Sequence, residues 1–462
     1  MISLRNLCTG RWPVHSFQTF GGAAAALLLA SAPLGFAAPA SAATATAALA
    51  ASSAAAQGQG IEDFYRGRKN APLWLTPAAG DAPQQLIALL VSASLDGLNP
   101  GKYQVPALQA ALQSASNGKR KDVFRADQLF SAAFASYVAD LKQDPGVGIS
   151  WVDPSLKPSA PTPLAALLAA AAAPSLADYV RTMGWMHPYY GELRRAVATH
   201  NYTSDHERDV LALNLQRVRV LPASPGKYVL VNAAQQRLYM FDGGKPVDSM
   251  VVVVGKPKWP TPMLAAYIRY AALNPYWYVP PDLAGEDVAQ FVVKQGLKYL
   301  DDYGYQVVDD WNPNPTIIDP KTVDWKGVLA GKVDVMIRQK PGPKNFMGRM
   351  KFMFPNQFGV YLHDNPRREL FLQSSRYFSG GCVRLEDAPR LGRWLFGRDL
   401  DWQSAGIEQP VTLANPVPVY ITYLTAMPDG QSIAYFDDVY GRDKAQVASS
   451  GPAPVADTAA GR

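Results

Sequence analysis

Apolar residues recur at steps of three and four positions in the first half of the chain. The positions that show this spacing best are Leu86, Leu89, Leu90, Phe130, Phe134, Tyr137 and Leu141. Such spacing puts apolar side chains on one face of a helix, where they can pack against a core. It predicts a mainly helical domain over residues 61–222.

After Pro222 the apolar residues come in short runs separated by turn-forming residues. The runs and turns are residues 228–231, Asn232-Ala233-Ala234, residues 237–241, Asp242-Gly243-Gly244, residues 250–254 and residues 358–363. Short apolar runs bounded by Gly, Asn and Asp are typical of strands. A helix is expected after Asp387, because Pro389 would stand in its first turn, where proline is tolerated. Residues 226–425 are therefore predicted to form a β-rich domain, so that the whole protein is α+β.

A stretch over about residues 275–343 interrupts the strand-like runs and is dense in Pro, Trp, Tyr and Asp. It contains an amphipathic segment over residues 285–300 and is too long for a simple connection. We therefore expect a small inserted lid subdomain. Its aromatic cluster Tyr276-Trp277-Tyr278 either packs within the lid or forms a wall that stacks against glycans. Packing is favoured, because aromatic rings are large apolar groups.

The two ends of the chain have a different composition. Arg5 and Arg11 precede an apolar stretch over residues 21–32, and Ala40-Ser41-Ala42 offers the small residues of a cleavage site. This order predicts a secretory signal peptide over residues 1–42, with an uncleaved membrane anchor as the alternative. Residues 43–60 and 445–462 are mostly small and polar, which predicts a flexible linker and a disordered tail.

The composition of the 462 residues excludes some classes of protein. With 48% hydrophobic and 18% charged residues, most of the chain can bury a core, which excludes a wholly disordered protein. The net charge of +6 is spread along the chain without a dense basic run. Nucleic-acid binding is not expected, because it needs a concentrated positive surface.

The chain has two cysteines, Cys8 and Cys382. Removal of the signal peptide would leave Cys382 alone, so that no internal disulfide could form. In an oxidising compartment, a single thiol is either buried and inert or kept for chemistry.

The residues around Cys382 are compatible with either role. Gly380 and Gly381 directly precede it and can aim backbone N–H groups at an oxyanion, and His363 is the only histidine after His206. An imidazole that takes the thiol proton would make the sulfur a nucleophile. The nearby charges, which are expected to favour a thiolate and an anionic substrate, are Arg367, Arg368, Arg376, Arg384, Arg390 and Arg393 against Asp364, Glu369, Glu386 and Asp387. The alternative is a buried structural cysteine beside a glycine turn.

His363 and the element Ser379-Gly380-Gly381-Cys382-Val383-Arg384 resemble the signature of L,D-transpeptidases with a YkuD-type catalytic domain. Further segments resemble the long, YcbB-like subgroup of Gram-negative bacteria: residues 64–65, 72–74, 96–100, 214–222, 274–280, 340–343, 351–356 and 360–364. The resemblance covers roughly residues 61–425. It implies a helical scaffold domain, a YkuD-type catalytic domain and a location in the periplasm.

The resemblance also implies an enzyme that forms 3-3 cross-links between peptidoglycan stem peptides. Cys382 would attack a tetrapeptide stem, form a thioester and release D-alanine, and an amine of a second stem would resolve the thioester. His363 would act as general acid and base. The residues expected to bind the oxyanion or the substrate are Tyr361, Ser379, Gly381 and Arg384. Donor and acceptor stems are the expected partners, and membrane contact is expected only if the signal peptide stays uncleaved.

Two features depart from the family pattern. Many members have a second histidine directly before the Gly-Cys pair, where this chain has Gly380, so any role of that imidazole is absent here. No pattern of a peptidoglycan-binding module is found between Tyr103 and Arg219.

Other functions stay open at this level. An L,D-carboxypeptidase or hydrolase would resolve the same thioester with water, and a catalytically dead wall-binding scaffold would form no thioester. Neither a metal nor another cofactor is expected, because His200 and His206 are not spaced for one helix face and no H-E-x-x-H motif occurs.

Overall fold

The structure, a computed structural model, describes residues 58–223, 226–312 and 314–450. The predicted signal peptide, most of the predicted linker and the last twelve residues of the predicted tail, 451–462, lie outside these residues. Among the described helices, none is long and apolar enough to cross a bilayer.

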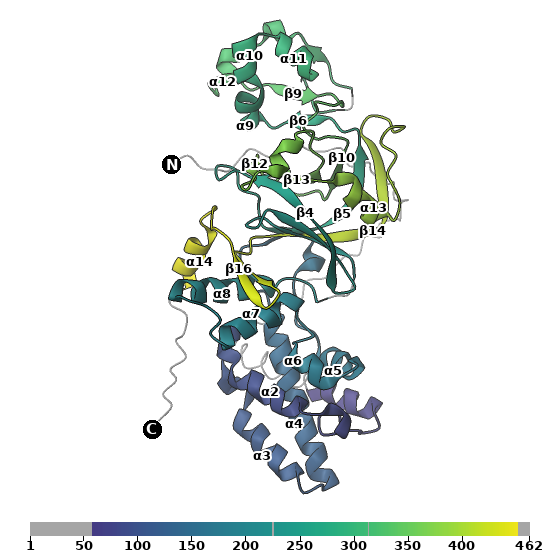
Figure 1. The fold of residues 1–462 in the computed structure, drawn as a ribbon. Coiled ribbons are helices and arrows are strands. Elements are labelled where there is room, and N and C mark those ends of the chain that lie inside the picture. Colours follow the sequence, from purple (N-terminus) through teal and green to yellow (C-terminus); the bar gives the residue numbers. More distant parts are fainter. Residues whose placement is uncertain (1–57, 224–225, 313, 451–462) are drawn as a thin grey trace, which may run out of the picture. The chain divides into compact units, whose positions relative to one another are not determined.

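The N-terminal part of the described chain is helical, as predicted (Figure 1). Its helices are residues 58–67, α2 (Ala82–Val91), α3 (Val105–Ala115), α4 (Arg120–Leu141), α5 (Pro163–Ala172), α6 (Leu176–Arg181), α7 (Pro188–Ala198) and α8 (Asp205–Val218). Short 3₁₀ helices cover Pro77–Ala79, Ala93–Asp96, Pro100–Tyr103 and Pro154–Leu156. In α4, Phe130, Phe134, Tyr137 and Leu141 are all fully buried, which confirms the helical spacing of these residues. The first described helix already includes residue 58, so helical structure starts within the predicted linker.

Eight strands of the described chain close into a barrel. Hydrogen-bonded neighbours follow the order β5-β10-β11-β13-β4-β3-β2-β14, and β14 pairs back with β5. The strands are β2 (Tyr228–Asn232), β3 (Arg237–Asp242), β4 (Lys245–Gly255), β5 (Leu264–Leu273), β10 (Met350–Met353), β11 (Leu362–His363), β13 (Val383–Leu385) and β14 (Gln409–Thr422). Two short strands extend the sheet, β1 (Ser150–Trp151) beside β5 and β12 (Tyr377–Ser379) beside β4. The predicted β-rich domain is confirmed, and closure leaves the barrel without a free edge.

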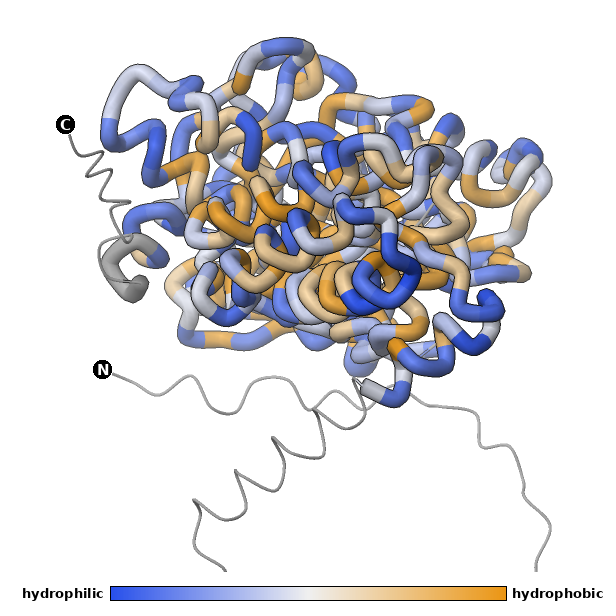
Figure 2. The backbone as a smooth tube through the Cα atoms, turned by 90° about the horizontal axis from the view of Figure 1, so that it is seen from below, coloured by the Kyte–Doolittle hydropathy of each residue, from blue (hydrophilic) through white to orange (hydrophobic). Residues whose placement is uncertain are grey.

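Stretches of hydrophobic residues lie toward the interior, and turns made of hydrophilic residues lie toward the outside (Figure 2). Strand β2 is buried along its whole length, and in β3 Leu238, Met240 and Phe241 are fully buried. The barrel therefore encloses a packed apolar core, and the polar chemistry described below lies on its other face.

Residues between β5 and β10 form a separate subdomain with its own apolar core, as the predicted lid requires (Figure 1). It contains a sheet of order β6-β9-β7-β8. Its elements are β6 (Trp277–Val279), α9 (Pro281–Ala284), a π-helical turn (Gly285–Ala289), α10 (Gln290–Gln295), α11 (Lys298–Tyr303), β7 (Tyr305–Val308), β8 (Ile317–Ile318), a 3₁₀ turn (Pro320–Thr322), α12 (Trp325–Leu329) and β9 (Met336–Gln339). Trp277 is buried in this core, so packing explains that member of the aromatic cluster.

The C-terminal part continues beyond the predicted end of the catalytic domain. Beyond residue 425 it has a hairpin of β15 (Ala426–Asp429) and β16 (Ser432–Tyr435), and α14 (Arg442–Ser450). A 3₁₀ turn (Arg368–Leu372) and α13 (Ala388–Phe396) precede that residue. Helix α13 starts directly after Asp387, as predicted, and the Asp387 carboxylate accepts from the N–H of Arg390 at 3.0 Å.

The tail predicted from residue 445 differs from the structure at its start, because α14 spans Arg442–Ser450. Asp443 of this helix is buried and pairs with the fully buried Arg217 of α8 at 2.6 Å. Arg217 also donates to the side chain of Gln446 at 2.8 Å. Local composition cannot predict an ion pair between residues so far apart in the chain. The prediction of a disordered tail from residue 445 was therefore wrong at its start.

Candidate active site

The loop from Ser379 to Cys382 is fixed by its own hydrogen bonds. The Ser379 hydroxyl donates to the Cys382 carbonyl oxygen at 2.6 Å and accepts from the Gly381 N–H at 3.1 Å. Gly381 has a φ of +114°, a conformation that side chains rarely allow. From outside the loop, Thr261 Oγ1 donates to the Gly381 carbonyl oxygen at 2.8 Å. These bonds hold Cys382 in place directly before β13.

Strands β11 and β13 place the predicted nucleophile and base on the same face of the sheet. The strands are parallel, with Leu362 opposite Val383 and His363 opposite Arg384. Leu362 and Val383 are buried in the barrel core, and side chains alternate along a strand. Their neighbours therefore point to the other face of the sheet, and one further step in register sets Tyr361 beside Cys382. The side chains that share this face are Tyr361, His363, Cys382 and Arg384.

The Cys382 thiol is neutral at rest. Burial raises its pKa above the usual value, and hydrogen bonds from Tyr361 and the charge of Arg384 offset this only in part. The sulfur lies 3.7 Å from the carbonyl oxygen of Gly359, to which the thiol donates a weak hydrogen bond. A base must therefore remove the proton when the sulfur attacks.

The expected field of six arginines does not form around the thiol. Arg384 lowers the pKa of Cys382, as expected. The other five are matched by local acceptors: Arg367 by Glu369 (3.0 Å), Arg368 by Asp364 (3.8 Å), Arg376 by the Gln373 carbonyl (2.6 Å), Arg390 by Asp248 (3.0 Å) and Arg393 by Asp399 (2.7 Å). Proximity in sequence did not predict the direction of these side chains, and burial outweighs the effect of Arg384, so the pKa of Cys382 stays raised.

His363 is held in the protonation state of a base. Its ring is buried, and its Nδ1 lies 2.6 Å from the backbone carbonyl oxygen of Asp364. A carbonyl oxygen only accepts, so Nδ1 carries the proton and Nε2 keeps a free electron pair. Burial, followed by the charge of Arg384, lowers the pKa of His363 to about 3. The imidazole is therefore neutral at physiological pH.

The buried histidines should make the protein sensitive to acid. His363 and His187 both have a pKa lowered by burial to about 3, against 6.5 for an unperturbed histidine. Between these values the unfolded chain binds protons that the folded chain excludes, so the free energy of unfolding falls as the pH falls from 6.5 toward 3. His363→Gln should flatten this dependence by about 1.4 kcal/mol per pH unit, as measured by urea denaturation. Equal slopes for the wild type and the variant would contradict the low pKa of His363.

Lys351 and Glu408 are site residues that the sequence analysis missed. Lys351 lies opposite His363 across β10 and β11, and its Nζ is 3.1 Å from Glu408 Oε1. Glu408 Oε2 accepts from the Tyr278 hydroxyl of the lid at 2.9 Å. The positive charge of Lys351 lowers the pKa of both His363 and Cys382. One signal was present in the sequence, namely a single cation inside the apolar run over residues 350–354.

The lid contacts this face directly. Leu283 packs so closely on Gly380 that a Cβ atom there would lie 2.7 Å from Leu283 Cδ1. Glu286 of the π-helical turn accepts from Lys256 at 2.8 Å and from Lys258 at 2.9 Å. The next residue, Asp287, is close enough to Arg384 to raise its pKa against the lowering caused by burial.

Two known protein families match parts of the chain. Residues 226–417 match the L,D-transpeptidase catalytic domain, YkuD, and residues 59–197 match the Scaffold domain. The chain carries an L,D-transpeptidase catalytic domain. A Haemophilus influenzae protein named "Putative L,D-transpeptidase" is 26% identical over 395 residues, which are 82% of this chain and 77% of that protein.

Two solved structures of L,D-transpeptidases are more distant. The enzyme from Mycobacterium smegmatis is 15% identical with a TM-score of 0.20, and the match covers 43% of this chain and 59% of that one. The catalytic domain of the E. faecium L,D-transpeptidase is 15% identical with a TM-score of 0.19, and the match covers 43% of this chain and 98% of that one. The chain thus spans about three fifths of the length of the M. smegmatis structure.

In this catalytic domain the lid occupies the space that the missing second histidine would need. Gly380→His should displace Leu283 and loosen the π-helical turn, because the new side chain meets an occupied position, at a cost of about 1–3 kcal/mol. Hydrogen exchange over residues 281–289 should become faster in this variant. Adding Leu283→Ala should reverse part of the effect.

The control for this experiment is Gly67→His, since a Cβ atom at Gly67 meets nothing within 4 Å. Unchanged exchange over residues 281–289 in Gly380→His would mean that Leu283 and Gly380 are not coupled.

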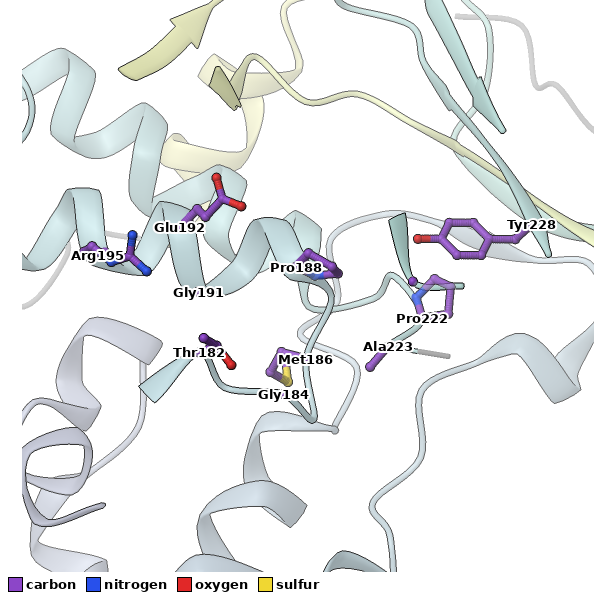
Figure 3. A pocket seen from close by; sticks show the side chains of 11 residues that line it. Thr182, Gly184, Met186, Pro188, Gly191, Glu192, Arg195, Pro222, Ala223 and Tyr228 are labelled. Carbon is purple, nitrogen blue, oxygen red and sulfur yellow. The ribbon is translucent and has the colours of Figure 1, made fainter. Parts of the chain in front are cut away.

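A separate cavity of about 320 Å³ lies beside α7 (Figure 3). Glu192 and Arg195 of α7 and Tyr228 of β2 line it, and none of the predicted catalytic residues does. Across the described residues, no three His, Cys, Asp or Glu side chains are grouped as metal ligands.

Proposed function

We propose that this protein is a peptidoglycan L,D-transpeptidase that forms 3-3 cross-links between stem peptides through a cysteine thioester. The observation that supports this most directly is the face shared by Cys382, His363, Tyr361 and Arg384 within a catalytic domain of that family. It combines a nucleophile, a neutral imidazole, a hydroxyl and a cation, which acyl transfer from a peptide with a free carboxylate can use.

The first half-reaction acylates the enzyme. Cys382 Sγ attacks the carbonyl carbon between meso-diaminopimelate and the terminal D-alanine while His363 Nε2 takes the thiol proton. The C–N bond of the tetrahedral intermediate then breaks, the imidazolium gives its proton to the leaving nitrogen, and D-alanine departs. The negative charge of the thiolate and of the D-alanine carboxylate favours the imidazolium in this complex, although His363 is a weak base at rest.

The second half-reaction transfers the acyl group. The neutral side-chain amine of a neighbouring stem attacks the thioester carbon, His363 accepts the amine proton, and the C–S bond breaks. The proton returns to the sulfur, so the enzyme is regenerated. Water in place of the amine would give hydrolysis instead of a cross-link.

The oxyanion of the tetrahedral intermediate needs donors next to Cys382. The Gly381 N–H, which was expected to be one of them, already donates to Ser379 Oγ, so Ser379 orders the loop and Gly381 is not assigned as a donor. The proposed donors are the Cys382 N–H and the Tyr361 hydroxyl, which is close enough to Cys382 to lower the pKa of its thiol.

Arg384 is the proposed partner of a stem carboxylate. Its Nε is buried and has no hydrogen-bond acceptor among the described residues. A carboxylate bound there would satisfy this donor and would sit beside the sulfur.

The proposed partners are two peptidoglycan stems, one as donor and one as acceptor, and the proposed location is the periplasm. Support for the location comes from the charged and apolar order of residues 1–42. N-terminal sequencing of the protein recovered from the producing cells tests it, and an intact N-terminus would contradict cleavage.

Mass spectrometry of the purified protein with a disaccharide-tetrapeptide tests the function. A cross-linked dimer formed with loss of D-alanine is the expected product. Tripeptide without dimer would point to an L,D-carboxypeptidase, and no reaction would point to a wall-binding scaffold.

A further inference from the structure

The segment that follows the β15–β16 hairpin and includes the first two residues of α14 reaches the neighbourhood of the catalytic loop. We call residues 436–443 the C-terminal strap. The Tyr440 hydroxyl donates to the Gly255 carbonyl oxygen at 2.6 Å and accepts from the Thr261 N–H at 3.4 Å. Arg442 Nη2 donates to the Thr261 carbonyl oxygen at 2.8 Å. The strap thus binds the backbone of Thr261 on both sides of that residue.

Thr261 passes this constraint to the catalytic loop. It is fully buried, and its hydroxyl accepts from the Gly255 N–H at 2.8 Å while donating to the Gly381 carbonyl oxygen at 2.8 Å. Gly255 is equally confined, because a Cβ atom there would lie 2.1 Å from the Trp259 carbonyl oxygen. The turn from Gly255 to Thr261 therefore has little room to move independently of the strap.

The other end of the strap is fixed on the helical domain. Asp443 pairs with Arg217 of α8 and accepts from the Thr425 hydroxyl at 2.7 Å. The guanidinium of Arg442 lies over the ring of Tyr440, 5.0 Å from its centroid. A continuous set of contacts thus joins α8 to Gly381.

The Gly381 carbonyl belongs to the same peptide unit as the Cys382 N–H. A trans peptide is planar, and its C=O and N–H point in opposite directions. A hydrogen bond that fixes the Gly381 oxygen therefore also fixes the direction of the Cys382 N–H and polarises it. That N–H is one of the two oxyanion donors in the proposed mechanism.

We propose that Tyr440 and Arg442 are positioning residues, which act through Thr261 to aim the Cys382 N–H at the oxyanion. This inference rests on the proposed function, since it assumes acyl transfer at Cys382. The strap and Thr261 do not touch the substrate. They set the direction of the Cys382 N–H. A small displacement of an oxyanion donor lowers the reaction rate strongly.

Two reactions of the Cys382 thiol can distinguish positioning of the oxyanion donor from a general effect on the structure. Acylation of Cys382 by a β-lactam passes through an oxyanion, whereas alkylation by iodoacetamide displaces iodide and forms none. Both rates can be followed at Cys382 by peptide mass spectrometry on the full-length protein. Tyr440→Phe and Thr261→Val should each slow acylation about tenfold and leave alkylation unchanged.

Tyr103→Phe is the matched control, because it also removes a tyrosine hydroxyl, which in this case donates to Asp140 at 2.8 Å in the helical domain. It should change neither rate. The proposal would be overturned if Tyr440→Phe slowed acylation and alkylation equally, or if it did not slow acylation. It would also be overturned if the wild type were alkylated but never acylated.

The proposed function is tested separately in the same samples by release of D-alanine from a tetrapeptide. A wild type that reacts with the β-lactam but releases no D-alanine would contradict cross-linking and still allow the strap to be tested by the ratio of acylation rates.

Discussion

Cys382→Ala should abolish both the release of D-alanine from a tetrapeptide stem and covalent labelling by a β-lactam. The variant lacks the atom that forms the thioester, and no other cysteine follows residue 8 in the sequence. The fold should persist, because the only hydrogen bond that the thiol donates among the described residues is the weak one to Gly359 at 3.7 Å. The expected change in the free energy of unfolding is within about 1 kcal/mol.

Mass spectrometry of the intact protein with a carbapenem checks the labelling, and product analysis checks turnover. Cys382→Ser is the companion variant. This variant should be inactive as well, because a serine hydroxyl has a far higher pKa than a thiol. An alanine variant that still forms cross-links would show that Cys382 is not the nucleophile.

His363→Gln should slow acylation by roughly 10²- to 10⁴-fold, the usual contribution of a positioned acid and base. The neutral thiol makes this loss unavoidable, because burial raises its pKa and no other neutral imidazole lies on the face of β11 and β13. The rate that remains should rise with pH, since only the thiolate fraction can then react. Stopped-flow measurement of β-lactam acylation over a range of pH would give both results.

The matched control for His363→Gln is His187→Gln. His187 is also buried, with a pKa also lowered by burial to about 3, but its ring bonds to the Tyr228 hydroxyl at 2.9 Å, away from Cys382. The His187→Gln variant should be less stable than the wild type but should keep a normal rate of acylation at Cys382. A near-normal rate in His363→Gln would remove His363 from the role of base.

The parts of the fold that were predictable from sequence depend on local pattern. Strand β2 and helix α13 follow from apolar runs, turn residues and a capping aspartate that lie next to each other in the chain. His363 and Cys382 could be predicted because a family signature contains both. The expected function was inferred from the resemblance to that family and not from the periodicity of apolar residues.

The parts that were missed depend on pairings between distant strands. Lys351 enters the site through the register of β10 with β11, and Thr261 enters it through a hydrogen bond to Gly381. The expectation for the arginines failed because they lie on different elements, with Arg384 on β13 and Arg390 and Arg393 on α13, and pair with different local acceptors. Asp443 was assigned to no domain because its partner, Arg217, lies in another part of the chain.

The neutral, half-buried thiol also has a consequence for chemical durability. Oxidants such as peroxide attack thiolates, and a cysteine with a raised pKa presents very little thiolate. In the proposed mechanism, Cys382 becomes strongly nucleophilic only while an acyl donor is bound and His363 takes the proton. If the protein is exported as proposed, this resting state would protect Cys382 from oxidation.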